Sequence, residues 1–213
     1  MREQTNTLTL RGPETSLAAR RGLRDVDIRL ALIAKMNRLH RGDANTRIIE
    51  ELGLCQGFAR VDLAVVNGTI HGYEIKSERD TLARLPGQIS IYSTALDFVT
   101  IVAAPSHVTR IGDIVPSWWG VWSVSRCENG FRLEPSRESR PNPQVNAFAL
   151  AQLLWRDEAL EVLADYGLNV GARSKPREFL WHRLASSLTL EQLGDVVRTR
   201  LKGRGVHWRS LGR

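Results

Sequence analysis

The chain has few of the features that mark secreted, membrane or zinc-binding proteins. It has 213 residues and only two cysteines, Cys55 and Cys127, which lie far apart and without CxxC spacing. This spacing argues against a zinc cluster, and we expect both to be buried free thiols. No apolar run approaches the roughly 20 residues that cross a bilayer, and residues 1–15 lack the apolar segment of a secretion signal. The sequence therefore predicts a cytoplasmic protein without a membrane segment.

Several catalytic patterns are also missing. The five histidines are scattered without H-x3-H spacing, and neither a G-x-S-x-G elbow nor a glycine-rich phosphate-binding loop occurs. Hydrophobic residues make up 42% of the chain and charged residues 25%, which is near the average of globular proteins and excludes a fibrous or wholly disordered chain. The length allows one core domain and a smaller appendage.

The positive charge of the chain is concentrated near its C-terminus. The formal net charge is +7, from 30 Lys and Arg against 23 Asp and Glu, and residues 171–213 hold 10 of the basic residues but only 3 of the acidic ones. Such a surplus in one segment is typical of a surface that binds a polyanion such as nucleic acid, although a solvated helical surface would look the same. The candidate contacts to nucleic acid in this segment are Arg198, Arg200, Lys202 and Arg204.

Periodicity divides the chain into four parts. Residues 1–22 show none and predict a mobile arm, whereas residues 23–133 predict an α/β core with a central mixed sheet flanked by helices. Residues 134–144 (EPSRESRPNPQ) are rich in proline and charge, so we expect a linker that can neither pair in a sheet nor continue a helix. Residues 145–213 have helical periodicity and predict a basic, all-helical extension.

Within the core, the pattern predicts helices over residues 25–39, over 44–52, where Asp43 and Gly53 would be caps, and from Pro86 through Leu96. Residues 98–103 and 120–124 are typical of buried strands. The strongest local signal is a β-hairpin, in which apolar residues alternate on both sides of Asn67-Gly68. The alternating residues are Val61, Leu63, Val65, Tyr73 and Ile75.

The hairpin carries Asp62 on its first strand, and Glu74 and Lys76 on its second. Side chains two apart on a strand share a face, so Glu74 and Lys76 point the same way. A two-residue Asn-Gly loop would pair Asp62 with Tyr73 and separate the two acids, whereas a three-residue loop, residues 67–69, pairs Asp62 with Glu74. We predict the three-residue loop, which places the acids and Lys76 on one face with Ala64 and Gly72, and the alternating apolar residues on the other.

Two carboxylates that face each other across strands repel unless a positive charge lies between them. Oxygen-only ligation of that charge suits Mg²⁺ or Mn²⁺, which bind through one or two carboxylates and substrate phosphate. Such an ion can activate a water and stabilise a leaving oxygen, while Lys76 orients the nucleophile and offsets negative charge. These are the parts that phosphodiester hydrolysis needs.

The segments R-V-D-L and G-Y-E-I-K-S resemble the core of the PD-(D/E)XK nuclease superfamily, with Val61 in place of the proline of that name. The resemblance implies a restriction-endonuclease-like core in which Asp62, Glu74 and Lys76 are catalytic and the two acids bind metal. In such proteins an acid from the preceding helix often completes the metal site, and here Glu51 is favoured over Glu50 by its angle to the apolar stripe of the expected helix.

Gln88 and Tyr92 form a Q-x3-Y spacing that is similar to an extra motif of RecB-like members of that superfamily. The pair shares a helix face, so both side chains could point to the metal site or to a bound strand. The resemblance therefore adds Gln88 to the catalytic residues and Tyr92 to the nucleic-acid contacts. It also extends to a group of small phage- and bacteria-associated proteins with a helical C-terminal extension.

Together these features predict a metal-dependent nuclease acting on nucleic acid, DNA in the first place, in repair, recombination or phage-host conflict. The alternative is a nucleic-acid-binding module whose nuclease-like core has lost turnover. The form of the substrate and the choice between endonuclease and exonuclease stay open. If the C-terminal segment does not bind nucleic acid, an apolar face could dock another protein or form a homodimer. That face would comprise Leu180, Leu184, Leu188 and Val196.

Overall fold

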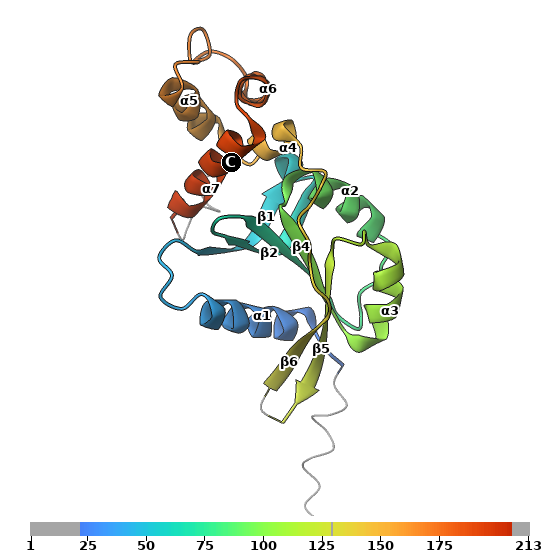
Figure 1. The fold of residues 1–213 in the computed structure, drawn as a ribbon. Helices are drawn as coiled ribbons and strands as arrows, with labels where there is room; N and C mark the ends of the chain where they lie inside the picture. Colours follow the sequence, from blue (N-terminus) through green and yellow to red (C-terminus); the bar gives the residue numbers. More distant parts are fainter. Residues whose placement is uncertain (1–21, 129, 206–213) are drawn as a thin grey trace, which may run out of the picture.

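A computed structural model describes residues 22–128 and 130–205, and its centre is one six-stranded mixed sheet with helices on both faces (Figure 1). The predicted mobile arm lies outside the described residues, apart from Gly22. No helix in the described part of the chain is long and apolar enough to cross a membrane. The strands, in sheet order, are β1 (Arg47–Leu54), β2 (Ala59–Val66), β3 (Ile70–Lys76), β4 (Phe98–Ala103), β5 (Gly120–Cys127) and β6 (Gly130–Arg137).

Strands that follow one another in the chain lie side by side in the sheet. Strands β1, β2 and β3 form an antiparallel meander, β4 and β5 continue the sheet parallel to β3, and β6 returns antiparallel to β5. The parallel connections run through α2 and α3, as parallel pairs require. The helices are α1 (Asp25–Leu39), α2 (Leu85–Ala95), α3 (Pro105–Ile114), α4 (Ala147–Ala151), α5 (Arg156–Asp165), α6 (Arg177–Ser187) and α7 (Leu190–Gly203), with a short 3₁₀ turn η2 (Cys55–Gly57).

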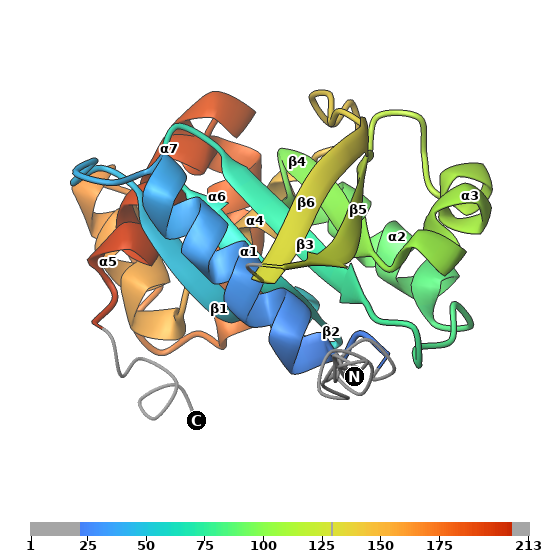
Figure 2. The ribbon, with the colours of Figure 1, turned by 90° about the horizontal axis from the view of Figure 1, so that it is seen from below.

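Helix α1 covers one face of the sheet, and α2 and α3 lie on the other (Figures 1 and 2). The buried residues of α1 recur every four positions; they are Ile28, Leu32 and Met36. They pack in one cluster with Leu63 and Val65 of β2. The predicted α/β class, with a mixed sheet flanked by helices and a helical C-terminal region, is confirmed.

The second helix that the sequence predicted, over residues 44–52, is wrong. This segment is largely strand β1, which pairs antiparallel with β2 from Arg47↔Val66 to Leu54↔Ala59. Ile48, Ile49 and Leu52 fit a helical stripe, but in the strand they lie in two different clusters. Ile48 packs in the cluster of α1, and Ile49 and Leu52 lie in the cluster that contains α2 and the C-terminal helices. A strand that is covered on both faces loses the alternation that would have identified it.

The expectation that residues 134–144 could not pair in a sheet is wrong for their first part. Glu134 and Pro135 lie in β6 and pair with Ser123 and Trp122, next to a register shift in β5. Proline is tolerated there because β6 is an edge strand of the sheet. The expected burial of both cysteines is also wrong, since Cys55 is half-buried and Cys127, near the tip of the β5–β6 hairpin, is exposed.

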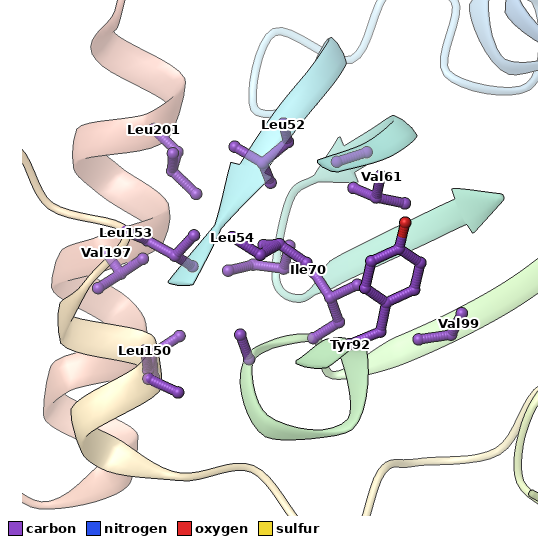
Figure 3. Packing of buried hydrophobic residues seen from close by; sticks show 14 of the residues in the cluster. Leu52, Leu54, Val61, Ile70, Tyr92, Val99, Leu150, Leu153, Val197 and Leu201 are labelled. Carbon is purple, nitrogen blue, oxygen red and sulfur yellow. The ribbon is translucent and has the colours of Figure 1, made fainter. Parts of the chain in front are cut away.

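The C-terminal helices share a hydrophobic core with the sheet. Leu52 and Leu54 of β1 lie beside Leu153, Val197 and Leu201, as Figure 3 shows. The apolar face that could have served a homodimer is largely used inside the chain, because Leu180 and Leu184 are fully buried and Leu188 is 8% exposed. The helical extension is therefore packed on the sheet that carries the candidate site.

Candidate active site

The turn of the hairpin fixes the register of the candidate acids. Val66 pairs with Ile70, so the loop has three residues, as predicted. Asn67 closes it, because its backbone N–H donates to the Thr69 carbonyl (3.0 Å) and its side-chain oxygen accepts from the Thr69 N–H (3.1 Å). Extended by one residue beyond the last pair, Leu63↔Tyr73, this register would set Asp62 opposite Glu74.

Strands β2 and β3 part where Asp62 lies. Their paired residues run from Val66↔Ile70 to Leu63↔Tyr73, and beyond this point the Asp62 carboxylate accepts the Ile75 N–H at 2.7 Å. The predicted alternation also ends here, because Val61 packs in the cluster that contains Tyr92 rather than with Leu63. The prediction that Val61 shares a face with Leu63 is therefore wrong. Strand pairing, which would keep the alternation regular, ends at Leu63, and beyond it the Asp62 side chain binds the Ile75 N–H.

Glu74 is the centre of the site and is only 3% exposed. Its Oε1 accepts hydrogen bonds from Lys76 Nζ (2.7 Å) and Gln88 Nε2 (2.6 Å), and its Oε2 accepts from the Tyr92 hydroxyl (2.7 Å). Gln88 Oε1 in turn accepts from Lys76 Nζ at 3.1 Å. The E-x-K and Q-x3-Y pairs thus converge on one carboxylate, because Gln88 and Tyr92 lie one turn apart on α2.

Tyr92 is fully buried, so it supports Glu74 rather than presenting its ring to a bound strand. Its hydroxyl also lies 2.7 Å from the Arg60 carbonyl oxygen, which ties α2 to β2. Burial, together with the charge of Glu74, raises the pKa of Tyr92, so the phenol keeps its proton and remains a donor.

Arg29 of α1 reaches Asp62 and Glu51 from the other face of the sheet. Its guanidinium contacts Asp62 Oδ1 (2.7 Å), the Asp62 carbonyl oxygen (3.0 Å) and Glu51 Oε1 (2.7 Å). This residue could not be identified from the sequence, because an arginine between Ile28 and Leu30 has no spacing that distinguishes it from a solvated helix residue. Only its contacts with Glu51 and Asp62 in the folded chain identify it.

Glu51 lies in the site, but it lies on strand β1 and not on the helix that the sequence predicted. Its φ of 56° is in the left-handed region, as are those of Cys55 (47°) and Gln56 (60°). These are the only non-glycine residues with positive φ in the described part of the chain, and such backbone strain clusters at functional sites. Glu50 is exposed and is not among the residues that line the acid pocket described next.

A pocket of about 670 Å³ opens over these acids. Asp62, Glu74 and Gln88 line it, whereas Lys76 lies behind Glu74 at 3% exposure. Arg84 lies on the α2 side and Arg60 on the β2 side. We call this cavity the acid pocket; its residues are Glu51, Gly57, Phe58, Ala59, Arg60, Asp62, Glu74, Ala83, Arg84, Gly87, Gln88 and Ile91.

Asp62 has an unusual protonation equilibrium. Its burial and the nearby charge of Glu74 raise the pKa of the Asp62 carboxyl to about 7, against the Ile75 N–H and the Arg29 guanidinium, which lower it. A carboxylate that resists ionisation in this way gains from a further positive charge placed next to it.

Comparison with known proteins places the chain in a family. The family model of bacteriophage P4 protein cII matches residues 19–210. The chain belongs to this family. Protein cII of Enterobacteria phage P4 is 31% identical over 183 residues, which cover 85% of this chain and 68% of that protein. Membership associates the chain with phage. A solved structure, the SPO1766 protein of unknown function from Silicibacter pomeroyi, covers 82% of this chain and 91% of its own, with 15% identity and a TM-score of 0.39.

In this cII-family chain, the four basic residues predicted to contact nucleic acid do not gather at the acid pocket. Arg198 pairs with Asp195 (2.6 Å) and Asp97 (3.7 Å). Arg200 binds Glu161 and Asp165 of α5, Lys202 contacts Asn45, and Arg204, only 8% exposed, binds Glu158. Much of the charge surplus of the extension therefore joins α7 to the rest of the molecule.

Proposed function

We propose that the chain is a metal-dependent nuclease that hydrolyses phosphodiester bonds in nucleic acid, DNA in the first place, with the acid pocket as its active site. The observation that carries this proposal is the convergence of Lys76, Gln88 and Tyr92 on Glu74 beside Asp62. Three donors on one buried carboxylate fix its position, as a preorganised catalytic site requires.

The donor set fits Mg²⁺ or Mn²⁺. Asp62, Glu74 and Glu51 all line the acid pocket, and their carboxylates offer hard oxygen ligands. Among the described residues, no group of three or more His, Cys, Asp or Glu is arranged to hold an ion by itself. Two carboxylates suit an ion that completes its shell with water and substrate phosphate. When bound, the ion supplies a low-pKa water and Lewis-acid stabilisation of the phosphoryl oxygen.

In this reaction a water oxygen bonds to phosphorus, the bond from phosphorus to the leaving sugar oxygen breaks, and that oxygen takes a proton. Asp62 and Glu74 would hold the ion, and Gln88 and Tyr92 would keep the Glu74 carboxylate oriented. The Lys76 ammonium would offset negative charge at Glu74 and at the reacting phosphate. Arg60 and Arg84, which line the pocket, would bind flanking phosphates.

The test is a cleavage screen over single-stranded DNA, duplex, branched junction and RNA, each with Mg²⁺, Mn²⁺ or EDTA. We expect cleavage with a divalent ion and none in EDTA. Lys76→Met should slow cleavage by about 10²-fold or more, as loss of a preorganised charge at a transition state does. Lys175→Met, at an exposed lysine in the connection between α5 and α6, is the matched control and should cut at the normal rate. Full activity of Lys76→Met would refute the assignment.

The second candidate is nucleic-acid binding without turnover, and the Arg29 contact favours it. A guanidinium that already neutralises Glu51 and Asp62 supplies the positive charge that the acids need without an ion. This function predicts that the wild type binds the oligonucleotides of the screen but leaves all of them intact with either ion. Cleavage of any one of them, lost in EDTA, excludes it.

A further inference from the structure

A second pocket lies across the η2 turn from the acid pocket. It has a volume of about 450 Å³ and lies between the end of β1 and helices α5 and α6. Gly57 lines both pockets, so the turn is the wall that separates them. We call it the tryptophan pocket, because Trp155 and Trp181 line it; Gln56, Arg156, Arg177 and Arg204 are among its other residues.

The wall between the pockets presents an exposed aromatic ring. Phe58 is 86% exposed and lines the acid pocket directly after η2. The backbone of η2 is held in left-handed conformations, with φ of 60° at Gln56 and 89° at Gly57. Strained backbone of this kind costs stability and clusters at functional sites, and here it carries an aromatic ring at the edge of the acid pocket.

The charges around this wall favour an anion. Among the described residues, no carboxylate lies within ion-pair distance of Arg177 or Arg84. The Arg177 guanidinium instead binds the neutral Gln56 side chain (2.8 Å) and lies 5.4 Å from the centre of the Trp181 ring. Arg156 and Arg177 are both exposed in the tryptophan pocket, and Asp157, the one acid among its lining residues, lies 3.4 Å from the Arg156 guanidinium. Arg177 is therefore the charge of this pocket that an anion would meet first.

Trp181 is only 2% exposed, and the guanidinium groups of Arg177 and Arg204 lie over the Trp181 and Trp155 rings at 5.4 and 4.3 Å, so the tryptophans hold the arginines in place and Phe58 is the aromatic face open to a ligand. An exposed aromatic face beside arginines is a combination that binds single-stranded nucleic acid, because every base has a face that can stack and every linkage carries a phosphate. In a duplex the bases are stacked on each other and cannot enter such a pocket without being flipped out. We propose that the tryptophan pocket and Phe58 bind unpaired nucleotides of a strand that crosses η2 from the acid pocket. This inference rests on the proposed function and names its substrate class, single-stranded nucleic acid or a single-stranded end.

The experiment measures binding in EDTA, so that cleavage does not interfere. The probes are a fluorescein-labelled single strand of deoxythymidine and a blunt duplex of the same length. Phe58→Ala should raise the Kd for the single strand about tenfold, as loss of one stacked base does, and leave the Kd for the duplex unchanged. Arg177→Gln should weaken single-strand binding and lower the magnitude of its salt dependence by about 0.7 in the logarithmic slope.

Matched controls are Val170→Ala, at an apolar residue that is 83% exposed, and Arg132→Gln, at an exposed arginine of β6. Both should bind the single strand normally. The proposal is overturned if the wild type does not bind the single strand, if Phe58→Ala and Arg177→Gln bind it normally, or if they weaken duplex binding equally.

The outcome separates this proposal from the proposed function. Selective loss of single-strand binding in a protein that never cleaves would support the tryptophan pocket and refute the nuclease. Cleavage by a protein whose Phe58→Ala and Arg177→Gln variants bind normally would refute the pocket and leave the nuclease standing.

Discussion

At the scale of single residues, Arg29 acts as a built-in cation. Its guanidinium contacts Glu51 and Asp62, and its side chain is only 17% exposed. With the arginine removed, Glu51 would keep its ion pair with Arg60 (3.4 Å), but Asp62 would keep only the Ile75 N–H against the charge of Glu74. We expect Arg29→Met to lower the free energy of unfolding by about 1–3 kcal/mol in EDTA, because it leaves partly buried charges unpaired.

Mg²⁺ should restore more stability to Arg29→Met than to the wild type, since the ion then replaces the missing positive charge. Urea denaturation with and without Mg²⁺ measures both effects, and Arg132→Met, at an exposed arginine far along the chain, is the control. Equal Mg²⁺ effects on the variant and the wild type would contradict a site in which arginine and ion serve the same acids.

Asp62 should give the protein an unusual dependence of stability on pH. Its pKa is raised to about 7 in the folded protein, and that of an unfolded chain is about 3.9. Between these values the folded state binds the proton more tightly, so the contribution of Asp62 to stability falls as pH rises from about 4 to about 7. Asp62→Asn cannot ionise and escapes this loss.

Urea denaturation in EDTA from pH 4 to pH 8 tests this behaviour. The stability of Asp62→Asn relative to the wild type should increase with pH up to about 7 and then level off. Asp157→Asn, at a carboxyl that is 88% exposed, provides the reference for an ordinary acid. A flat difference across the range would show that the Asp62 pKa is not raised.

At the scale of elements, the turn between β2 and β3 sets the register of the acids. Asn67→Ala removes the side-chain acceptor of the Thr69 N–H and should lower the free energy of unfolding by about 1 kcal/mol. The ladder from Val66↔Ile70 to Leu63↔Tyr73 should still hold the register, so cleavage by the folded variant should be unchanged. A loss of activity in fully folded Asn67→Ala would mean that the turn alone sets the register.

The hairpin could be predicted from sequence because a turn signal and an alternating pattern agree there. Strand β1 could not, since Ile48, Ile49 and Leu52 satisfy a helical stripe and the strand is covered on both faces. The same element explains why Glu51 was found for an incorrect reason. The residues around Glu74 could be predicted because they lie at fixed spacings on β3 and α2. The Arg29 contact could not, because it joins α1 to β2, and no local sequence pattern specifies how these two segments pack.

At the scale of the whole molecule, the sheet and the C-terminal helices share one core. Leu201 of α7 is fully buried and packs in the cluster that includes Leu52 of β1. Leu201→Ala should lower the free energy of unfolding by about 2–5 kcal/mol. Sheet and helices should still unfold in a single transition, monitored by far-ultraviolet circular dichroism and tryptophan fluorescence. Leu190→Ala, at a leucine that is 44% exposed, is the control, and two separated transitions would contradict a shared core.

The most direct test of the account is the Mg²⁺-dependent single-turnover cleavage rate of Asp62→Asn. The neutral form of this side chain is already accessible near pH 7, so the substitution should leave the fold intact and should not lower the stability of the protein at that pH. Asparagine cannot supply the negative oxygen ligand that an ion needs, and we expect a rate at least about 10²-fold below that of the wild type on the substrate it cuts best. Asp113→Asn, at an exposed carboxyl of α3 that lines neither pocket, should cut normally. A folded Asp62→Asn variant that cleaves at the wild-type rate, or a wild type that cleaves equally well in EDTA, would contradict the nuclease assignment.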